Sequence, residues 1–198
     1  MGADVTPNPD TFTILVVCTG NVCRSPLAHQ LLQTAVATRL SPELASAVVV
    51  HSAGTEAPVG AAMSAPAAVI SARLGNDPTT HSARQLTVSD IHSADLVLVA
   101  SRRHRSEVAQ LVPRATRTMF TIREFARIAA TLESAPVASV SDLRDTVARV
   151  AAHRGYAPVD DPALDDIVDP IGRSERTYER MASELVPAIA SVSATLFG

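Results

Sequence analysis

The chain has 198 residues and a formal net charge of -3, and 46% of its residues are hydrophobic, 19% charged and 3% aromatic. This balance is typical of a globular protein that buries a core, and it excludes a disordered chain. The negative net charge gives no reason to expect a nucleic-acid partner, and no apolar run reaches the ~18 residues that a membrane span needs.

The first ten residues are polar and have neither the positively charged start nor the apolar core of a signal peptide. We expect 1–10 to be a disordered lead, 11–198 to form one domain, and the protein to be cytoplasmic and not bound to a membrane. The two cysteines, Cys18 and Cys23, are too few for a disulfide framework, so their significance is local.

Strands and helices alternate along most of the chain. The apolar, β-branched run 12–17 predicts a buried strand, and Ser25-Pro26 predicts the start of a helix with Ser25 as its N-cap. Further strands are predicted at 48–50, 96–99 and 117–120, and further helices at 61–74, 101–112, 122–132 and 174–196. Such alternation predicts an α/β fold in which a parallel sheet is covered by helices on both faces.

Residues 134–166 interrupt this alternation and form an inserted segment. Within it, 141–154 predicts an amphipathic helix, which either packs beside the functional cleft as a cap or lies at the periphery. The acidic stretch 160–166 that follows is typical of a solvated face. The basic run 102–105, after the third strand, either steers anionic substrates or is a solvated helix start.

The loop after the first strand carries the clearest chemical signal. Cys18, Arg24 and Ser25 follow the spacing cysteine, five residues, arginine, hydroxyl residue, between a strand and a helix. This placement gathers backbone N–H groups and the positive end of the helix dipole around one concavity, which suits a tetrahedral oxyanion. Gly20 permits a sharp bend, and Arg24 can hold two phosphate oxygens at once. We therefore predict that Cys18 is a thiolate nucleophile to which Ser25 donates a hydrogen bond.

The segment Val17–Pro26 resembles the signature of the low-molecular-weight protein tyrosine phosphatases. Other segments are similar to the later motifs of this family and follow in the same order: Ser52–Thr55, His81–Leu86, Ala94–Leu98, Glu124-Phe125 and Asp169-Pro170. The resemblance covers about 12–132 and 167–196. We expect one domain with a four-stranded parallel sheet in the order 2-1-3-4.

The resemblance implies a two-step mechanism that needs neither a metal nor a cofactor. Cys18 attacks phosphorus and forms a phosphocysteine, while Asp169 protonates the leaving oxygen and then activates the hydrolytic water. Arg24 and the loop amides stabilise the phosphoryl oxygens. Since the acid must carry a proton, activity is expected to favour mildly acidic to neutral pH. The phosphate-binding residues would be Thr19, Gly20, Asn21, Val22, Cys23 and Arg24.

Further roles carry over from the resemblance. Asn21, Ser52 and His81 match the hydrogen-bond network that holds the loop in the family, and Asn21 tolerates a left-handed backbone. Cys23 either forms a reversible disulfide with Cys18 or fills a small space in the core.

A second Asp-Pro pair, Asp161-Pro162, competes with Asp169-Pro170 for the role of the acid. Asp169 is favoured because Gly172, Ser174 and a helix carrying Tyr178 follow it, as in the family.

The chain departs from the family where aromatic residues usually wall the cleft: Ile171-Gly172 follows the Asp-Pro pair, and Glu56–Pro58 follows Thr55. The chemistry of a tyrosine phosphatase is therefore better supported than a preference for phosphotyrosine. The expected partner is a phosphorylated protein, such as a bacterial tyrosine kinase, or a small phosphate ester. Two alternatives stay open: an arsenate reductase that uses a small-thiol reductant on the same fold, and a non-catalytic phosphate-binding module.

Overall fold

The first strand, β1 (Phe12–Cys18), explains why the molecule is layered. Side chains on one face of β1 belong to one apolar cluster (Phe12, Ile14 and Val16), and Leu15 and Val17 belong to a second cluster. Because successive side chains of a strand point to opposite faces, both faces of the sheet are covered at β1. The computed structural model describes residues 8–133 and 135–198.

The elements follow β1 in this chain order: α1 (Arg24–Arg39), α2 (Pro42–Ser46), β2 (Val48–Gly54), α3 (Ala65–Arg73), η1 (Pro78–Thr80), α4 (Val88–His92), β3 (Leu96–Val99), α5 (Arg102–Leu111), η2 (Pro113–Arg117), β4 (Met119–Thr121), α6 (Ile122–Ala129), α7 (Val140–Ala152), η3 (Arg154–Tyr156), η4 (Pro162–Asp165) and α8 (Glu175–Phe197).

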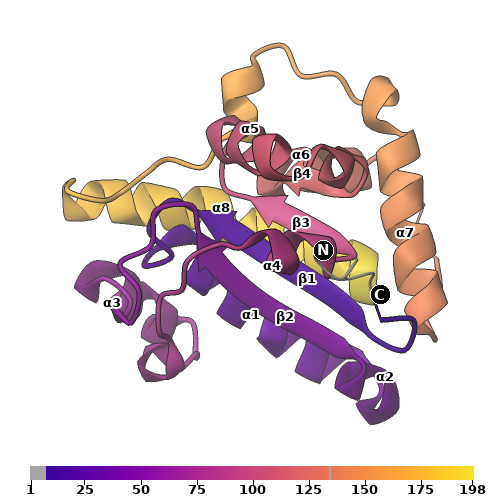
Figure 1. Cartoon of the computed structure of the whole chain (residues 1–198), viewed down its shortest axis with the longest axis horizontal. Helices are drawn as coiled ribbons and strands as arrows, with labels where there is room; N and C mark the ends of the chain where they lie inside the picture. The colour runs from indigo at the N-terminus through magenta and orange to yellow at the C-terminus, as the bar shows by residue number, and fades with distance from the viewer. Residues whose placement is uncertain (1–7, 134) are drawn as a thin grey trace, which may run out of the picture.

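The four strands form one parallel sheet in the order β2-β1-β3-β4, so the predicted topology is confirmed (Figure 1). Helices α1, α3, α6, α7 and α8 contribute to the apolar cluster on one face, and α4 and α5 contribute to the cluster on the other. In a parallel sheet the carboxyl ends of all strands meet at one edge, where ligands bind in α/β folds. The loop after β1 lies at this edge.

Some boundaries differ from those predicted. Helix α1 begins at Arg24 with Cys23 as its N-cap, so the prediction of Ser25 as N-cap is wrong. The hydroxyl of Ser25 contacts Cys18 Sγ and Asn21 Nδ2 instead of capping the N-terminus of α1. Strand β2 continues to Gly54, well beyond the apolar run 48–50, because its pairing with β1 extends to Cys18.

The inserted helix α7 lies away from the carboxyl edge of the sheet. Its Arg144 donates hydrogen bonds to the carbonyl oxygens of Asn8, Pro9 and Thr11 and pairs with Asp95, all next to the amino ends of β1 and β3. Leu143, Val147 and Val150 of α7 are buried in the larger apolar cluster. The alternative that this helix caps the cleft is therefore wrong.

Residues 1–7 of the predicted disordered lead lie outside the described residues. Within 8–133 and 135–198, none of the helices combines the length and the apolar character that a membrane crossing requires.

Candidate active site

The loop between β1 and α1 forms the centre of the site. It leaves the sheet at Cys18 and enters α1 at Arg24, and Asn21 in its middle has a left-handed backbone with φ of 51°. Among the residues that the structure describes, the N-cap side chain of Cys23 makes no capping hydrogen bond to the first-turn amides of α1. These N–H groups, together with the positive end of the helix dipole, can therefore bind an anion.

Asn21 is held through both polar atoms of its side chain and through its carbonyl oxygen. Its Nδ2 donates to Ser25 Oγ (2.9 Å) and to Ser52 Oγ (2.8 Å), and its Oδ1 accepts from the backbone N–H of Arg84 (3.0 Å). Its carbonyl oxygen lies 2.6 Å from His81 Nε2, which must be the donor because a carbonyl can only accept. The supporting residues predicted from the sequence thus converge on Asn21. Arg84 was missed as a member of this network, although it lies in the predicted segment His81–Leu86.

Cys18 is only 2% exposed, and its Sγ lies 2.9 Å from Ser25 Oγ. Because Ser25 already accepts a hydrogen bond from Asn21 Nδ2, its own hydroxyl hydrogen is available to Cys18 Sγ. This arrangement suits a thiolate acceptor.

Arg24 is 4% exposed and connects the loop with the predicted acid. Its Nη2 lies 2.6 Å from Asp169 Oδ2 and 3.5 Å from Thr19 Oγ1, and its Nη1 donates to the carbonyl oxygen of Ile167 (3.3 Å). Its Nε is buried and has no hydrogen-bond partner in the part of the chain that the structure describes. A buried cationic N–H without an acceptor is costly, so Nε and Nη2 offer a pair of donors for two oxygens of one phosphate.

The structure separates the two Asp-Pro pairs. Asp169 lies against Arg24, with its side chain half exposed. Asp161 instead accepts a hydrogen bond from the backbone N–H of Ala163 at the start of η4. Of the two aspartates, Asp169 is the one beside the loop. Its role as the acid stays a prediction.

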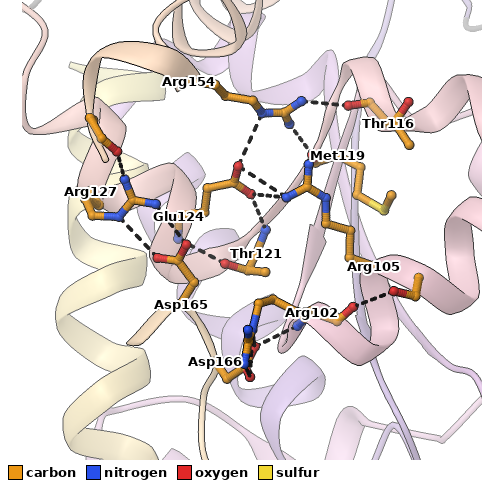
Figure 2. Close-up of polar contacts among 12 residues, drawn as sticks. Arg102, Arg105, Thr116, Met119, Thr121, Glu124, Arg127, Arg154, Asp165 and Asp166 are labelled. Atoms are coloured by element: carbon orange, nitrogen blue, oxygen red, sulfur yellow. Dashed lines mark hydrogen bonds and ion pairs between the residues drawn. The ribbon is translucent and has the colours of Figure 1, made fainter. Parts of the chain in front are cut away.

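The expectation of a solvated acidic face is wrong for two residues of the stretch. Asp165 is buried and pairs with Arg127, and Asp166 pairs with Arg102 (Figure 2). No spacing pattern predicts these pairs, because the partners lie on other helices, 38 and 64 positions away along the chain.

His104 is a site residue that sequence reasoning missed. It is 2% exposed, its Nε2 lies 2.9 Å from Thr19 Oγ1, and its Nδ1 lies 2.8 Å from Ser101 Oγ. Burial, and then the nearby charge of Arg24, lower the pKa of His104 to about 4, so the imidazole is neutral at neutral pH. Within the basic run, His104 looked like one more surface charge.

The arginines of the basic run are paired with carboxylates. Arg103 pairs with Glu56 and Glu107, and Arg105 pairs with Glu124. Their charge is thereby largely compensated, which favours a structural role over the steering of anions.

Cys23 is buried, and its side chain contacts a residue outside the loop. Its Sγ is 2.9 Å from Ser64 Oγ, and burial raises the pKa of its thiol. Both cysteines are free. The disulfide that the resemblance implies stays a prediction.

The segment after β2 is bonded to the loop. The backbone N–H groups of Thr55 and Glu56 donate to the carbonyl oxygens of Cys18 and Thr19, and the side chain of Pro58 lies beside Gly20. Val59, which follows Pro58, is 73% exposed, and Ile171, two residues after Asp169, is 52% exposed. The exposed apolar residues next to these two segments are aliphatic.

Solved structures share this fold over most of the chain. The low molecular weight protein tyrosine phosphatase from T. tengcongensis is 27% identical with a TM-score of 0.64, and the match covers 92% of this chain and 97% of that one. The YwlE arginine phosphatase from Geobacillus stearothermophilus is 26% identical with a TM-score of 0.64, covering 92% and 90%. The fold is thus that of small phosphatases of the low molecular weight type.

Sequence comparison identifies the family. The model of the low molecular weight phosphotyrosine protein phosphatases matches residues 13–135. The "Probable low molecular weight protein-tyrosine-phosphatase EpsP" of Ralstonia solanacearum is 38% identical over 112 residues, which cover 57% of this chain and 71% of that protein. Wzb of Escherichia coli K12, a low molecular weight protein-tyrosine-phosphatase, is 38% identical over 100 residues, which cover 50% and 62%. The chain belongs to the low molecular weight phosphotyrosine protein phosphatase family.

The family match ends at residue 135, close to residue 134, where the insertion is predicted to begin. The extent of the insertion, 134–166, stays a prediction.

Proposed function

We propose that the chain hydrolyses phosphate monoesters through a phosphocysteine formed on Cys18. The first candidate substrate is phosphotyrosine in proteins. The observation that carries this proposal is the convergence of four groups at one sheet edge. These are the Cys18 thiol, the uncapped amides at the start of α1, the buried guanidinium of Arg24 and the carboxyl group of Asp169.

In the first step, Cys18 Sγ donates an electron pair to phosphorus while the bond from phosphorus to the leaving oxygen breaks. The protonated carboxyl group of Asp169 gives its proton to that oxygen. Arg24 and the amides of Thr19, Gly20, Asn21, Val22 and Cys23 stabilise the charge on the non-bridging oxygens, as in other phosphoryl transfers.

In the second step, Asp169 takes a proton from a water molecule whose oxygen attacks phosphorus, and the bond between sulfur and phosphorus breaks. Cys18 leaves as a thiolate, which the hydroxyl of Ser25 stabilises. Phosphate and the free enzyme result, and no external reductant or metal takes part.

The contact between Asp169 and Arg24 implies an exchange of partners on binding. The carboxylate lies 2.6 Å from Nη2, one of the two N–H groups that a phosphate would use. A substrate oxygen therefore replaces the carboxylate on Arg24, and Asp169 turns towards the leaving oxygen. The half-exposed side chain of Asp169 leaves room for this rotation.

A second candidate substrate is protein phosphoarginine. The observation that favours it is that Pro58 and Val59 after β2, and Ile171 after Asp169, offer no aromatic ring for a phosphotyrosine to stack on. A solved structure with 26% identity is described as an arginine phosphatase.

The proposed partner is a tyrosine-phosphorylated protein, such as a bacterial tyrosine kinase, and the proposed compartment is the cytoplasm. A nucleophilic thiol needs reducing conditions, and thiols stay reduced in the cytosol.

Steady-state kinetics with a panel of substrates tests the proposal: a phosphotyrosine peptide, a phosphoserine peptide, a phosphoarginine protein, para-nitrophenyl phosphate, and arsenate with a small thiol. Cys18→Ser should abolish turnover of every phosphate substrate, and Asp169→Asn should slow turnover and change its pH dependence. Consumption of thiol with arsenate, without ester hydrolysis, would show an arsenate reductase instead. Full hydrolysis by Cys18→Ser would rule out the proposed nucleophile.

A further inference from the structure

We propose that Asp165 and Asp166 are positioning residues for the general acid. They fasten the segment 165–168, called here the acid strap, so that Asp169 is held beside the phosphate loop. This inference rests on the proposed function, because it concerns the delivery of the proton by Asp169.

The first attachment of the acid strap is the pair of Asp165 with Arg127 of α6. Arg127 Nη2 lies 2.8 Å from Asp165 Oδ2, and Nε lies 3.2 Å from Oδ1, which makes a two-point contact. The side chain of Asp165 is largely buried. A buried, bidentate pair fixes both position and orientation more strictly than an exposed contact does.

The second attachment is made by Asp166 at the start of α5. Its carboxylate accepts a hydrogen bond from the backbone N–H of Arg102 (2.7 Å) and pairs with Nη2 of the same arginine (2.9 Å). A carboxylate at a helix N-terminus also interacts favourably with the helix dipole. Asp166 thus ties the strap to the helix that carries His104.

The backbone of the acid strap is bonded as well. The N–H of Ile167 donates to the carbonyl oxygen of Ala100 (2.9 Å), directly after β3, and the N–H of Val168 donates to Glu184 of α8 (2.9 Å). Arg123 of α6 donates to the carbonyl oxygen of Asp166 (3.2 Å). The strap is therefore fixed to the sheet edge and to three helices within four residues.

The strap reaches the catalytic arginine directly. The carbonyl oxygen of Ile167 accepts from Arg24 Nη1, while Asp169, two residues further on, contacts Nη2 of the same guanidinium. A displacement of the strap would therefore move both the acid and one support of Arg24. Since Ile167 lies next to Asp166, the ion pair with Arg102 is one peptide unit away from this contact.

The charges around the strap continue into the rest of the insertion. Figure 2 shows Glu124 between Arg105 and Arg154, close to the pair of Arg127 and Asp165. Arg154, in η3, donates to the carbonyl oxygens of Thr116 and Met119 beside the edge strand β4. The insertion is thus bound to the β4 edge before the chain enters the strap.

The test compares Asp166→Ala with Asp160→Ala. Asp160 belongs to the same acidic stretch but makes no side-chain hydrogen bond or ion pair among residues 8–133 and 135–198, so it serves as the matched control. Two substrates are used: phenyl phosphate, whose leaving oxygen needs a proton, and 2,4-dinitrophenyl phosphate, whose leaving group departs without one. Thermal unfolding is followed for each variant to confirm that it is folded.

We expect Asp166→Ala to lower kcat/KM for phenyl phosphate roughly tenfold or more, because proton transfer to the leaving oxygen is disturbed. The value for the dinitrophenyl ester should fall by no more than about threefold, because only the weakened support of Arg24 affects it. Arg102→Gln should give the same selective loss, and the double variant should be no worse than either single one. Asp160→Ala should leave both values unchanged.

An equal loss for both esters, or no loss for either, would overturn the positioning role of Asp166. The proposed function is tested separately by the wild-type protein. If it hydrolyses neither ester, or if Cys18→Ser retains activity, the proposed function fails; if it hydrolyses both and Asp166→Ala is not selective, the strap proposal alone fails.

Discussion

The close contact between Gly54 and the phosphate loop leads to a sharp prediction for the variant Gly54→Ala. Gly54 pairs with Cys18 across β2 and β1. A methyl group at this position would overlap the carbonyl oxygen of Thr19 and come within 2.9 Å of the amide nitrogen of Asn21. Both atoms belong to the backbone of the loop, so neither can move aside as a flexible side chain would.

Relief of this overlap requires the loop to shift by about 0.5–1 Å, and a displacement of about 1 Å at reacting groups costs roughly 10²-fold in rate. We therefore expect kcat/KM for para-nitrophenyl phosphate to fall roughly 100-fold, equivalent to about 2.7 kcal/mol. Inhibition by inorganic phosphate should weaken in parallel, because the same amides bind it. The matched control is Gly155→Ala in η3, where an added methyl group meets no atom within 4 Å.

The comparison decides whether the loop is held as rigidly as the contacts indicate. The control should retain the wild-type kcat/KM within about twofold, since surface substitutions of this kind are nearly neutral. If Gly54→Ala keeps kcat/KM within about threefold of wild type, the loop shifts easily and its backbone contacts do not hold it rigidly.

Three further predictions concern the support of the site and the insertion. Because the pKa of His104 is lowered to about 4, below that of an unfolded histidine, the unfolded chain binds more protons between about pH 6.5 and 4. The free energy of unfolding should therefore fall as pH is lowered through this window, by up to about 3 kcal/mol from His104. When this free energy is measured by urea unfolding at several pH values, it should change less steeply with pH in His104→Asn than in the wild type. An equal pH dependence in both proteins would contradict the burial of a neutral imidazole. Asn21→Ala removes the side-chain bonds to Ser25 and Ser52 at a left-handed residue, so kcat should drop roughly tenfold or more, whereas wild-type kinetics would show that this network is dispensable. Leu143→Ala in α7 should lower the free energy of unfolding by about 2–5 kcal/mol and leave kcat/KM unchanged at 25 °C; a large loss of kcat/KM in folded protein would mean that α7 does influence the cleft.

Local sequence signals sufficed where the structure is determined locally. The β-branched run of β1 predicted a strand buried on both faces, and the spacing of Cys18 and Arg24 predicted a loop between that strand and a helix. Helices α2 and α4 were not predicted because each has only five residues, too few to show a helical period. The polar residues His51 and Ser52 hid the second half of β2, which pairing with β1 stabilises.

Long-range contacts account for most of what the sequence could not predict in the site. His104 contacts Thr19 across 85 positions, and Arg24 contacts Ile167 across 143. No spacing rule connects such residues, because the sheet topology brings them together. The same applies to Asp165. The acidic composition of the stretch 160–166 predicted that this side chain would be exposed, but the opposite charge of Arg127 offsets the desolvation cost of burying it.

The position of α7 explains how a long segment can precede Asp169 without moving it. The entropy cost of closing a loop grows only with the logarithm of its length, so extra residues between α6 and Asp169 add little. What fixes Asp169 is the chain just before it, where the N–H of Ile167 bonds to Ala100 after β3 and its carbonyl oxygen bonds to Arg24. The segment upstream can therefore differ in length and pack against the amino ends of the strands, as α7 does, while the distance from Asp169 to Arg24 is set at the carboxyl edge.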